Sequence, residues 1–174
     1  MSEDYLSIAS LSRDSVVDGP GLRHVLFLAG CSHNPHCSGC HNPHLWDIDA
    51  GILTTISALH FLLSDYIIGY VGLTISGGEP LDQYTNLCKL IELLNKKRYH
   101  ANRFNLEIPA HDVMIYTGYI FKEIQRKFPR ILQLADIIVD GRYEQSKPPA
   151  KWRGSNNQRI WQRQKDGSWL LSAV

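Results

Sequence analysis

Four short apolar segments alternate with helical patterns along the chain, and this alternation limits the possible folds more than any other feature. The apolar segments have the length of buried strands, and each runs into glycine or a polar turn. We expect strands at residues 24–29, 71–76, 113–117 and 136–140. Apolar residues recur at helical spacing in residues 54–66, 84–98 and about 119–128. Strands that alternate with helices indicate parallel βαβ units, so the predicted class is α/β.

The size and charge of the chain limit its organisation. Its 174 residues, 44% of them hydrophobic, suffice for one compact domain with a sizeable core. We expect residues 1–174 to form this single domain, with an irregular closing segment at 146–174. The formal net charge of +1 creates no global field that would attract nucleic acid or a membrane. No apolar run approaches the ~20 residues that span a bilayer, and no basic signal start is present, so a cytoplasmic location is expected.

Polar or glycine-rich turns follow all four expected strands. In parallel sheets, ligands gather at the carboxyl ends of the strands. These ends carry Cys31 and the residues after it, Gly77-Gly78-Glu79, Thr117-Gly118 and Asp140-Gly141. The sequence therefore predicts one binding rim to which four separate turns contribute.

The first of these turns contains three cysteines within ten residues, Cys31, Cys37 and Cys40. Thiols in the cytoplasm stay reduced, so such a group indicates metal ligands rather than disulfides. Three thiolates leave one iron of a 4Fe-4S cluster open to chelation by the amino and carboxylate groups of an amino acid. S-adenosylmethionine carries such groups. An electron passed to its sulfonium breaks a carbon–sulfur bond and gives methionine and a 5′-deoxyadenosyl radical, which can abstract hydrogen.

A tetrahedral zinc site is the alternative interpretation of the same cysteines, with His33, His36, His41 or His44 as the fourth ligand. The Gly-Gly-Glu-Pro turn that starts at Gly77 favours the cluster. Such a turn offers backbone carbonyls and a carboxylate to an ammonium group, which structural zinc does not need. The remaining cysteine, Cys88, lies in an amphipathic helical pattern and is expected to belong to the core.

Several motifs together resemble the radical S-adenosylmethionine superfamily and, within it, the glycyl-radical-enzyme activases. The amino-terminal motifs are Asp18-Gly-Pro-Gly-Leu-Arg23, Cys40-His-Asn-Pro, Trp46-Asp47 and Gly77-Gly78-Glu79-Pro80. The carboxyl half is similar to the subgroup that activates anaerobic ribonucleotide reductase, in Tyr116-Thr-Gly-Tyr119, Val139-Asp-Gly-Arg142 and Trp152-Arg-Gly-Ser155 through Asn157-Gln158. The resemblance implies a partial (βα) barrel of parallel strands. It also implies a 4Fe-4S cluster, S-adenosylmethionine and a glycyl radical enzyme as partner.

The resemblance assigns roles to residues of the rim. Backbone at Gly39, Cys40 and His41 is expected near the adenosine, and Gly77, Gly78 and Glu79 near the methionine end. Thr117 and Asp140 are candidates for contact with ribose or methionine, and a plain turn cap is the alternative for each. Arg153 could reach the cofactor carboxylate or the partner. Two features depart from the usual pattern, which has C-x3-C-x2-C spacing and often an aromatic residue before the last cysteine. This chain has C-x5-C-x2-C and Gly39.

The predicted function is therefore the reductive cleavage of S-adenosylmethionine and the generation of a glycyl radical on anaerobic ribonucleotide reductase. One cluster uses three of the four cysteines, so the electron is expected to come from an external donor such as a flavodoxin. Three alternatives remain at this stage. They are an activase of the pyruvate formate-lyase type, a radical enzyme that acts on a small molecule, and a noncatalytic zinc-binding module.

Overall fold

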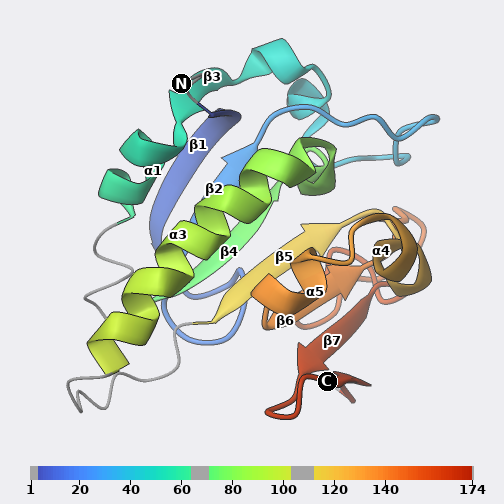
Figure 1. The fold of residues 1–174 in the computed structure, drawn as a ribbon. Helices are drawn as coiled ribbons and strands as arrows, with labels where there is room; N and C mark the ends of the chain where they lie inside the picture. The colour runs from blue at the N-terminus through green and yellow to red at the C-terminus, as the bar shows by residue number, and fades with distance from the viewer. Residues whose placement is uncertain (1–3, 64–70, 103–111, 174) are drawn as a thin grey trace.

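One mixed sheet forms the centre of the computed structural model, which describes residues 4–63, 71–102 and 112–173 (Figure 1). The eight strands lie in the order β3-β1-β2-β4-β5-β6-β7-β8. Their bounds are β1 Tyr5–Ser15, β2 Arg23–Leu28, β3 Ile52–Thr55, β4 Gly72–Gly77, β5 Val113–Thr117, β6 Ile137–Asp140, β7 Arg159–Arg163 and β8 Trp169–Leu171. Strands β2, β4, β5 and β6 are parallel, and β1, β3, β7 and β8 extend this centre by antiparallel pairing.

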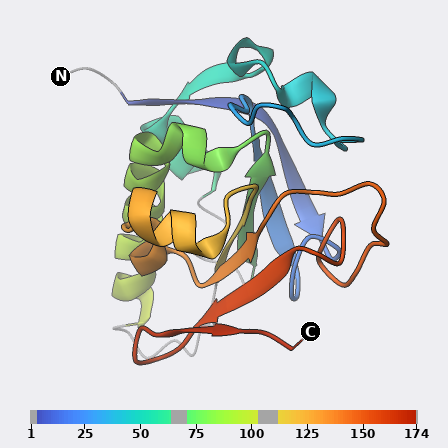
Figure 2. The same cartoon turned by 90° about the vertical axis from the view of Figure 1, so that its right-hand side faces the viewer.

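The helices α1, α3 and α5 lie on one side of the sheet (Figure 2). The described helices are α1 Ile56–Leu62, α3 Tyr84–Asn102, α4 Phe121–Lys127 and α5 Ile131–Leu134. Three 3-10 turns accompany them, η1 Pro43–Leu45, η2 Ile48–Ala50 and η3 Pro80–Gln83. None of the described helices is long and apolar enough to cross a membrane.

The register of the parallel strands sorts their side chains between two faces. Leu26, Ile75, Ile115 and Ile138 are paired across β2, β4, β5 and β6, and all four are buried in the core together with α3 residues such as Leu90. The next residue along each strand points to the opposite face, because side chains alternate in a strand. That second row contains Phe27, Ser76, Tyr116 and Val139. The helices thus cover one face, and the other face is left for a ligand.

The parallel centre confirms the predicted α/β class, with strands at all four expected places. The helix expected at 54–66 begins at Ile56 and is capped by Thr55, whose hydroxyl accepts from the amide of Ala58 at 3.1 Å. Its expected residues 64–66 lie outside the described residues. Cys88 is buried in α3 within the core, as predicted.

The closing segment corrects the expectation of an irregular stretch at 146–174. It contains β7, which pairs with β6, and β8, which pairs with β7. Strand β7 reads Arg-Ile-Trp-Gln-Arg, and only Ile160 in it is fully buried. A short strand with so few apolar residues gives little periodicity to detect. Strands β1 and β3 were also not predicted, although the alternation of polar and apolar residues through much of β1 is itself a strand signal.

A buried arginine holds the amino-terminal ends of the parallel strands together. Arg23 is 1% exposed, and its Nε donates to the hydroxyl of Thr74 at 2.7 Å. Its other nitrogens donate to the carbonyls of Pro20 and Leu73, both at 3.0 Å, and it forms an ion pair with Asp112. Because a buried cation requires such partners, the loop before β2 and the starts of β4 and β5 are fixed to one another.

We expect Arg23→Met to lower the free energy of unfolding of the metal-free protein by about 2–4 kcal/mol, because it leaves buried carbonyls without a donor and Asp112 without its cation. Urea unfolding followed by circular dichroism measures this change. Arg13→Met is the control, since Arg13 is exposed on β1, and its effect should stay within about 0.5 kcal/mol. Equal effects of the two substitutions would contradict the proposed role of Arg23.

Candidate functional site

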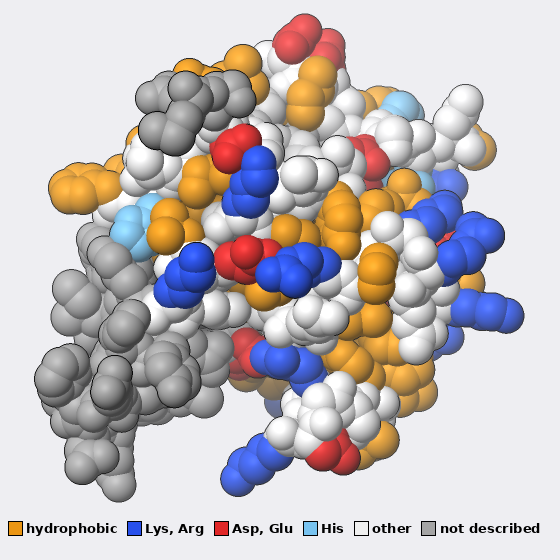
Figure 3. All heavy atoms as spheres, in the orientation of Figure 1, with side chains coloured by type: hydrophobic (Ala, Val, Ile, Leu, Met, Phe, Trp, Pro, Cys, Tyr) orange, Lys and Arg blue, Asp and Glu red, His pale blue; other side chains and the backbone are white. Residues whose placement is uncertain are grey.

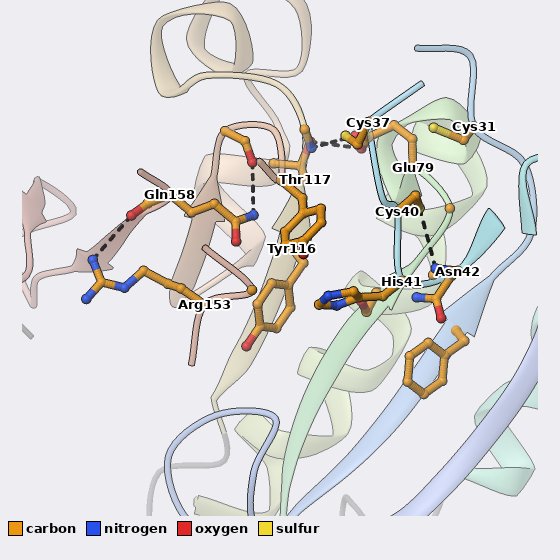
Figure 4. A pocket seen from close by; sticks show the side chains of 18 of the residues that line it. Cys31, Cys37, Cys40, His41, Asn42, Glu79, Tyr116, Thr117, Arg153 and Gln158 are labelled. Atoms are coloured by element: carbon orange, nitrogen blue, oxygen red, sulfur yellow. Dashed lines mark hydrogen bonds between the residues drawn. The ribbon is translucent and has the colours of Figure 1, made fainter. Parts of the chain in front are cut away.

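A cavity of about 480 Å³ opens at the carboxyl ends of β2, β4, β5 and β6 (Figure 4). Phe27, Ser76 and Tyr116, from the second row of the sheet, contribute to its lining. Figure 4 shows the cysteines and Glu79 on one side of the pocket and Arg153 and Gln158 across from them. The cavity therefore lies where the sequence predicted a binding rim.

The three clustered cysteines all line this cavity. Cys31, Cys37 and Cys40 form no disulfide, and each is partly exposed. The amide of Cys40 donates to the carbonyl of Cys37 at 3.2 Å, and its sulfur accepts from the amide of Asn42 at 3.4 Å. Burial raises the pKa of Cys31 to about 11, so metal binding at this thiol must displace a proton at neutral pH.

The donor chemistry of the loop fits a 4Fe-4S cluster. Three soft thiol ligands face one cavity, and each would bind a different iron atom. In residues 4–63, 71–102 and 112–173, no three His, Cys, Asp or Glu side chains stand close enough to hold a single metal ion. A zinc ion would need all its ligands within about 2.3 Å, so the loop would have to contract around it. A 4Fe-4S cluster does not require the three thiolates to meet at one point, because each binds a different iron atom.

The histidines of the loop have structural partners. The ring of His36 stacks on Trp46, with centroids 4.0 Å apart and planes at 5°, and its Nε2 lies 3.0 Å from the carbonyl of Cys31. His41 lines the cavity and contacts the ring of Tyr143 at 4.4 Å. These contacts make His36 a stacked and hydrogen-bonded residue of the loop. They also place an aromatic wall of His41 and Tyr143 beside Cys40.

The two glycines of the second turn are required by a close approach of backbone. A Cβ at Gly77, whose φ is +120°, would lie 2.1 Å from the carbonyl oxygen of Leu28. A Cβ at Gly78 would lie 2.0 Å from the carbonyl oxygen of Gly30. The amides of Gly78 and Glu79 use this proximity, since they donate to Leu28 and Gly30 at 2.9 and 2.7 Å. The turn is thereby fixed against the start of the cysteine loop.

The carboxylate of Glu79 is an anchor for three segments. It is buried, and its Oε1 accepts from the amide of Leu81 at 3.0 Å and the hydroxyl of Thr117 at 2.8 Å. Its Oε2 accepts from the amide of Gly118 at 2.8 Å and lies 2.9 Å from Nε2 of His33. Four partners match the four lone-pair positions of a carboxylate. The carboxylate therefore has an anchoring role, and its expected contact with an ammonium group stays a prediction, since Glu79 also lines the cavity.

Other predicted residues divide between the cavity and its surroundings. Thr117 lines the cavity, although its hydroxyl is committed to Glu79. Asp140 does not line it, which corrects the expectation of a cofactor contact. The buried carboxylate of Asp140 accepts from the amide of Phe121 and from Nε of Arg159 at 2.9 Å, and so ties β6 to α4 and β7. Gly39 also lies outside the lining, packed beside the side chain of Gln145.

The closing segment supplies cavity residues that sequence reasoning missed or left open. Arg153 lines the cavity, and its guanidinium donates to the carbonyl of Gln158 at 3.2 Å. Gln158 lines it as well, held by a bond from its amide to the carbonyl of Gly141 at 3.0 Å. Tyr116 donates its hydroxyl to the carbonyl of Trp152 at 2.9 Å, which joins β5 to this wall. Tyr116 and Trp152 belong to motifs that this chain shares with the family it resembles. Membership in those motifs was the one indication in the sequence that they belong to the site.

Known proteins resemble this chain over most of its length. A family model described as a 4Fe-4S single cluster domain matches residues 17–161. An anaerobic ribonucleoside-triphosphate reductase-activating protein of Enterobacteria phage T4 is 39% identical over 155 residues, which cover 88% of this chain and 91% of the relative. Proteins of the same description are 35% identical in Vibrio cholerae, over 83% of this chain and 90% of the relative, and 32% identical in Escherichia coli K12, over 82% and 90%.

The anchoring role of Glu79 predicts an unusual sensitivity to an isosteric change. In Glu79→Gln an amide N–H₂ must face N–H donors in place of one carboxylate oxygen, so we expect a loss of about 2–4 kcal/mol in the free energy of unfolding. Urea unfolding of the metal-free protein measures it. Glu144→Gln, at a carboxylate 46% exposed, should change the value by less than about 0.5 kcal/mol. If the Glu79→Gln protein is as stable as the unsubstituted chain, Glu79 has no anchoring role.

Proposed function

Since the chain belongs to the family of anaerobic ribonucleoside-triphosphate reductase-activating proteins, we propose that it generates a glycyl radical on an anaerobic ribonucleotide reductase. In this proposal Cys31, Cys37 and Cys40 hold a 4Fe-4S cluster, which supplies the electron that cleaves S-adenosylmethionine. The observation that carries the proposal is the meeting of the three cysteines and the Gly-Gly-Glu turn at one cavity.

Residues that line the cavity would hold S-adenosylmethionine close to the three cysteines. Ser76, Gly77 and Gly78 present backbone along the β4 end of the cavity, where the absent side chains leave room for the methionine group. The rings of His41 and Tyr143 offer a surface for the adenine. The guanidinium of Arg153, on the cavity wall, is suited to pair with the carboxylate of S-adenosylmethionine. Glu79 acts indirectly, because it holds the Gly-Gly turn, Thr117 and His33 in one arrangement.

The parallel strands and their one-sided helices correspond in this proposal to the partial (βα) barrel of the radical S-adenosylmethionine superfamily. The cofactor would lie against the face formed by Phe27, Ser76 and Tyr116. The glycine loop of the partner enters by the edge of the cavity that Val17 and Asp18 line. Val17 is 73% exposed there, and the adjacent Val16 is 69% exposed, so an apolar segment is available to a partner at this entrance.

The proposed ligands predict a contrast among the four cysteines. Replacement of Cys31, Cys37 or Cys40 by Ala should lower bound iron and sulfide and abolish cleavage of S-adenosylmethionine, because one iron loses its thiolate. Cys88→Ala should keep the iron, since Cys88 is buried in α3. Anaerobic purification with iron and sulfide analysis measures the first effect, and deoxyadenosine production after chemical reduction measures the second. Full iron content in Cys37→Ala would refute the ligand assignment.

The proposed activity predicts a radical on another chain. Anaerobic incubation with S-adenosylmethionine, a chemical reductant and an anaerobic ribonucleotide reductase should give a glycyl radical signal in electron paramagnetic resonance. The glycyl signal should be absent when the reductase carries Ala in place of its radical glycine. Any radical formed on that alanine would carry a methyl group at Cα and would show a different hyperfine pattern. Cleavage of S-adenosylmethionine without any radical on the reductase would point to a different substrate.

A further inference from the structure

The segment between the first two proposed cluster ligands is longer than in the usual C-x3-C pattern. Five residues, 32–36, separate Cys31 from Cys37. None of residues 31–40 is buried. Figure 3 shows His side chains at the edge of the molecule from which this loop projects in Figure 1. The core therefore contributes little to the conformation of the loop, which depends on local contacts.

The start of the loop is joined to the end of η1 by two backbone hydrogen bonds. The amide of Gly30 donates to the carbonyl of Leu45 at 2.8 Å, and the amide of Cys31 donates to the carbonyl of Trp46 at 2.9 Å. Leu45 is buried, so this part of the chain is fixed to the body of the protein. The backbone of the first ligand is thereby anchored next to Trp46.

The end of the loop is tied to the same place by His36, the residue immediately before Cys37. Its Nε2 lies 3.0 Å from the carbonyl oxygen of Cys31. A carbonyl oxygen can only accept, so Nε2 carries the proton and donates it. The ring of His36 also stacks on that of Trp46, with centroids 4.0 Å apart and planes at 5°. A flat contact of this kind fixes the plane of the ring as well as its position.

These contacts form a closed arrangement of Cys31, His36 and Trp46, which we term the brace. Cys31 bonds to the other two residues through its backbone, and the two rings contact each other. Rotation of the His36 side chain would break its bond to Cys31 and its stack on Trp46 together. Because Cys37 follows His36 directly, the brace fixes the second ligand relative to the first.

Other residues of the loop are held by different elements. Ser32 donates its amide and its hydroxyl to the carboxylate of Asp82, at 2.6 and 2.7 Å. His33 lies 2.9 Å from the carboxylate of Glu79. These contacts hold the loop close to the first ligand. The brace adds a connection between the first ligand and the second.

We propose that His36 and Trp46 are positioning residues for the cluster, and that the brace allows the longer C-x5-C spacing to present Cys31 and Cys37 together. This inference rests on the proposed function. Ordering five residues when the metal binds would cost conformational entropy, whereas a loop already held in place loses little. Contacts that orient metal ligands typically change metal affinity about 10–100-fold when they are removed.

The experiment measures the rate of iron release from the cluster-loaded protein, under anaerobic conditions, after addition of a ferrous chelator. His36→Ala should release iron at least about tenfold faster, because both the bond and the stack are lost. His36→Phe keeps a flat ring and His36→Gln keeps an N–H donor, so each should lie between His36→Ala and the unsubstituted protein. The matched control is His44→Ala, at an exposed histidine of η1 outside the brace, which should stay within about twofold.

A double-mutant cycle tests whether the two rings act as one unit. Trp46→Ala should also speed iron release. The His36→Ala, Trp46→Ala double variant should be no faster than His36→Ala, since the stack is already absent in that protein. Additive effects of the two substitutions would contradict the brace.

Unfolding of the metal-free protein distinguishes positioning from a general effect on the fold. The urea midpoint should be the same in His36→Ala and His44→Ala, because the loop contains no buried residue. A lower midpoint in His36→Ala would overturn the inference, since faster iron release would then follow from unfolding.

Further measurements separate failure of this inference from failure of the proposed function. If the unsubstituted protein binds one zinc ion without sulfide, the proposed function fails. If it binds iron and sulfide and cleaves S-adenosylmethionine, but His36→Ala releases iron no faster than His44→Ala, the brace is overturned. Pulsed electron paramagnetic resonance of the reduced cluster should show no strong coupling to a ring nitrogen of His36. Such a coupling would make His36 a ligand and would also overturn the brace.

Discussion

The arrangement of the candidate site depends on one buried carboxylate. Glu79 follows β4, yet its partners come from η3, from the end of β5 and from the cysteine loop. A buried anion is stable only when donors surround it, so folding brings these segments to the same point or leaves the charge uncompensated. The cavity acquires its shape from this requirement. The glycines before Glu79 then let the backbone of β2 approach closely enough to bring the cysteine loop to the anchor.

A buried charge of opposite sign stands at the other end of the parallel strands. Arg23 binds carbonyls and a hydroxyl at the amino ends of β2 and β4, and Glu79 binds donors at the carboxyl ends. The apolar side chains between these two charges account for most of the buried surface, but hydrophobic contacts do not depend on direction. The two ions fix the strand ends, because each has a limited number of hydrogen bonds with defined directions. The stable centre and the site are therefore held by different interactions within the same four strands.

The sequence was informative wherever a residue's place follows from the topology. Cys31, Gly78 and Thr117 lie at the ends of parallel strands, and such ends meet at one edge whatever the details of packing. Partners that depend on approach in space could not be found in this way. The contact between His33 and Glu79 joins residues 46 positions apart. Asp140 has the right position along its strand, but its carboxylate is bound by Arg159 and the start of α4. Strand β7 alternates too few apolar residues to be recognised.

The wall of the cavity that carries Arg153 and Gln158 has a consequence for the order in which the site is assembled. A ribosome makes the cysteine loop about 100 residues before it makes the segment from Arg142 to Gln158. During that interval the thiols belong to a chain that already contains β2 and β4 but lacks the opposite wall. The wall opposite the cysteines is thus supplied by one of the last parts of the chain to be made, and the cavity cannot take its final form before that segment folds against the sheet.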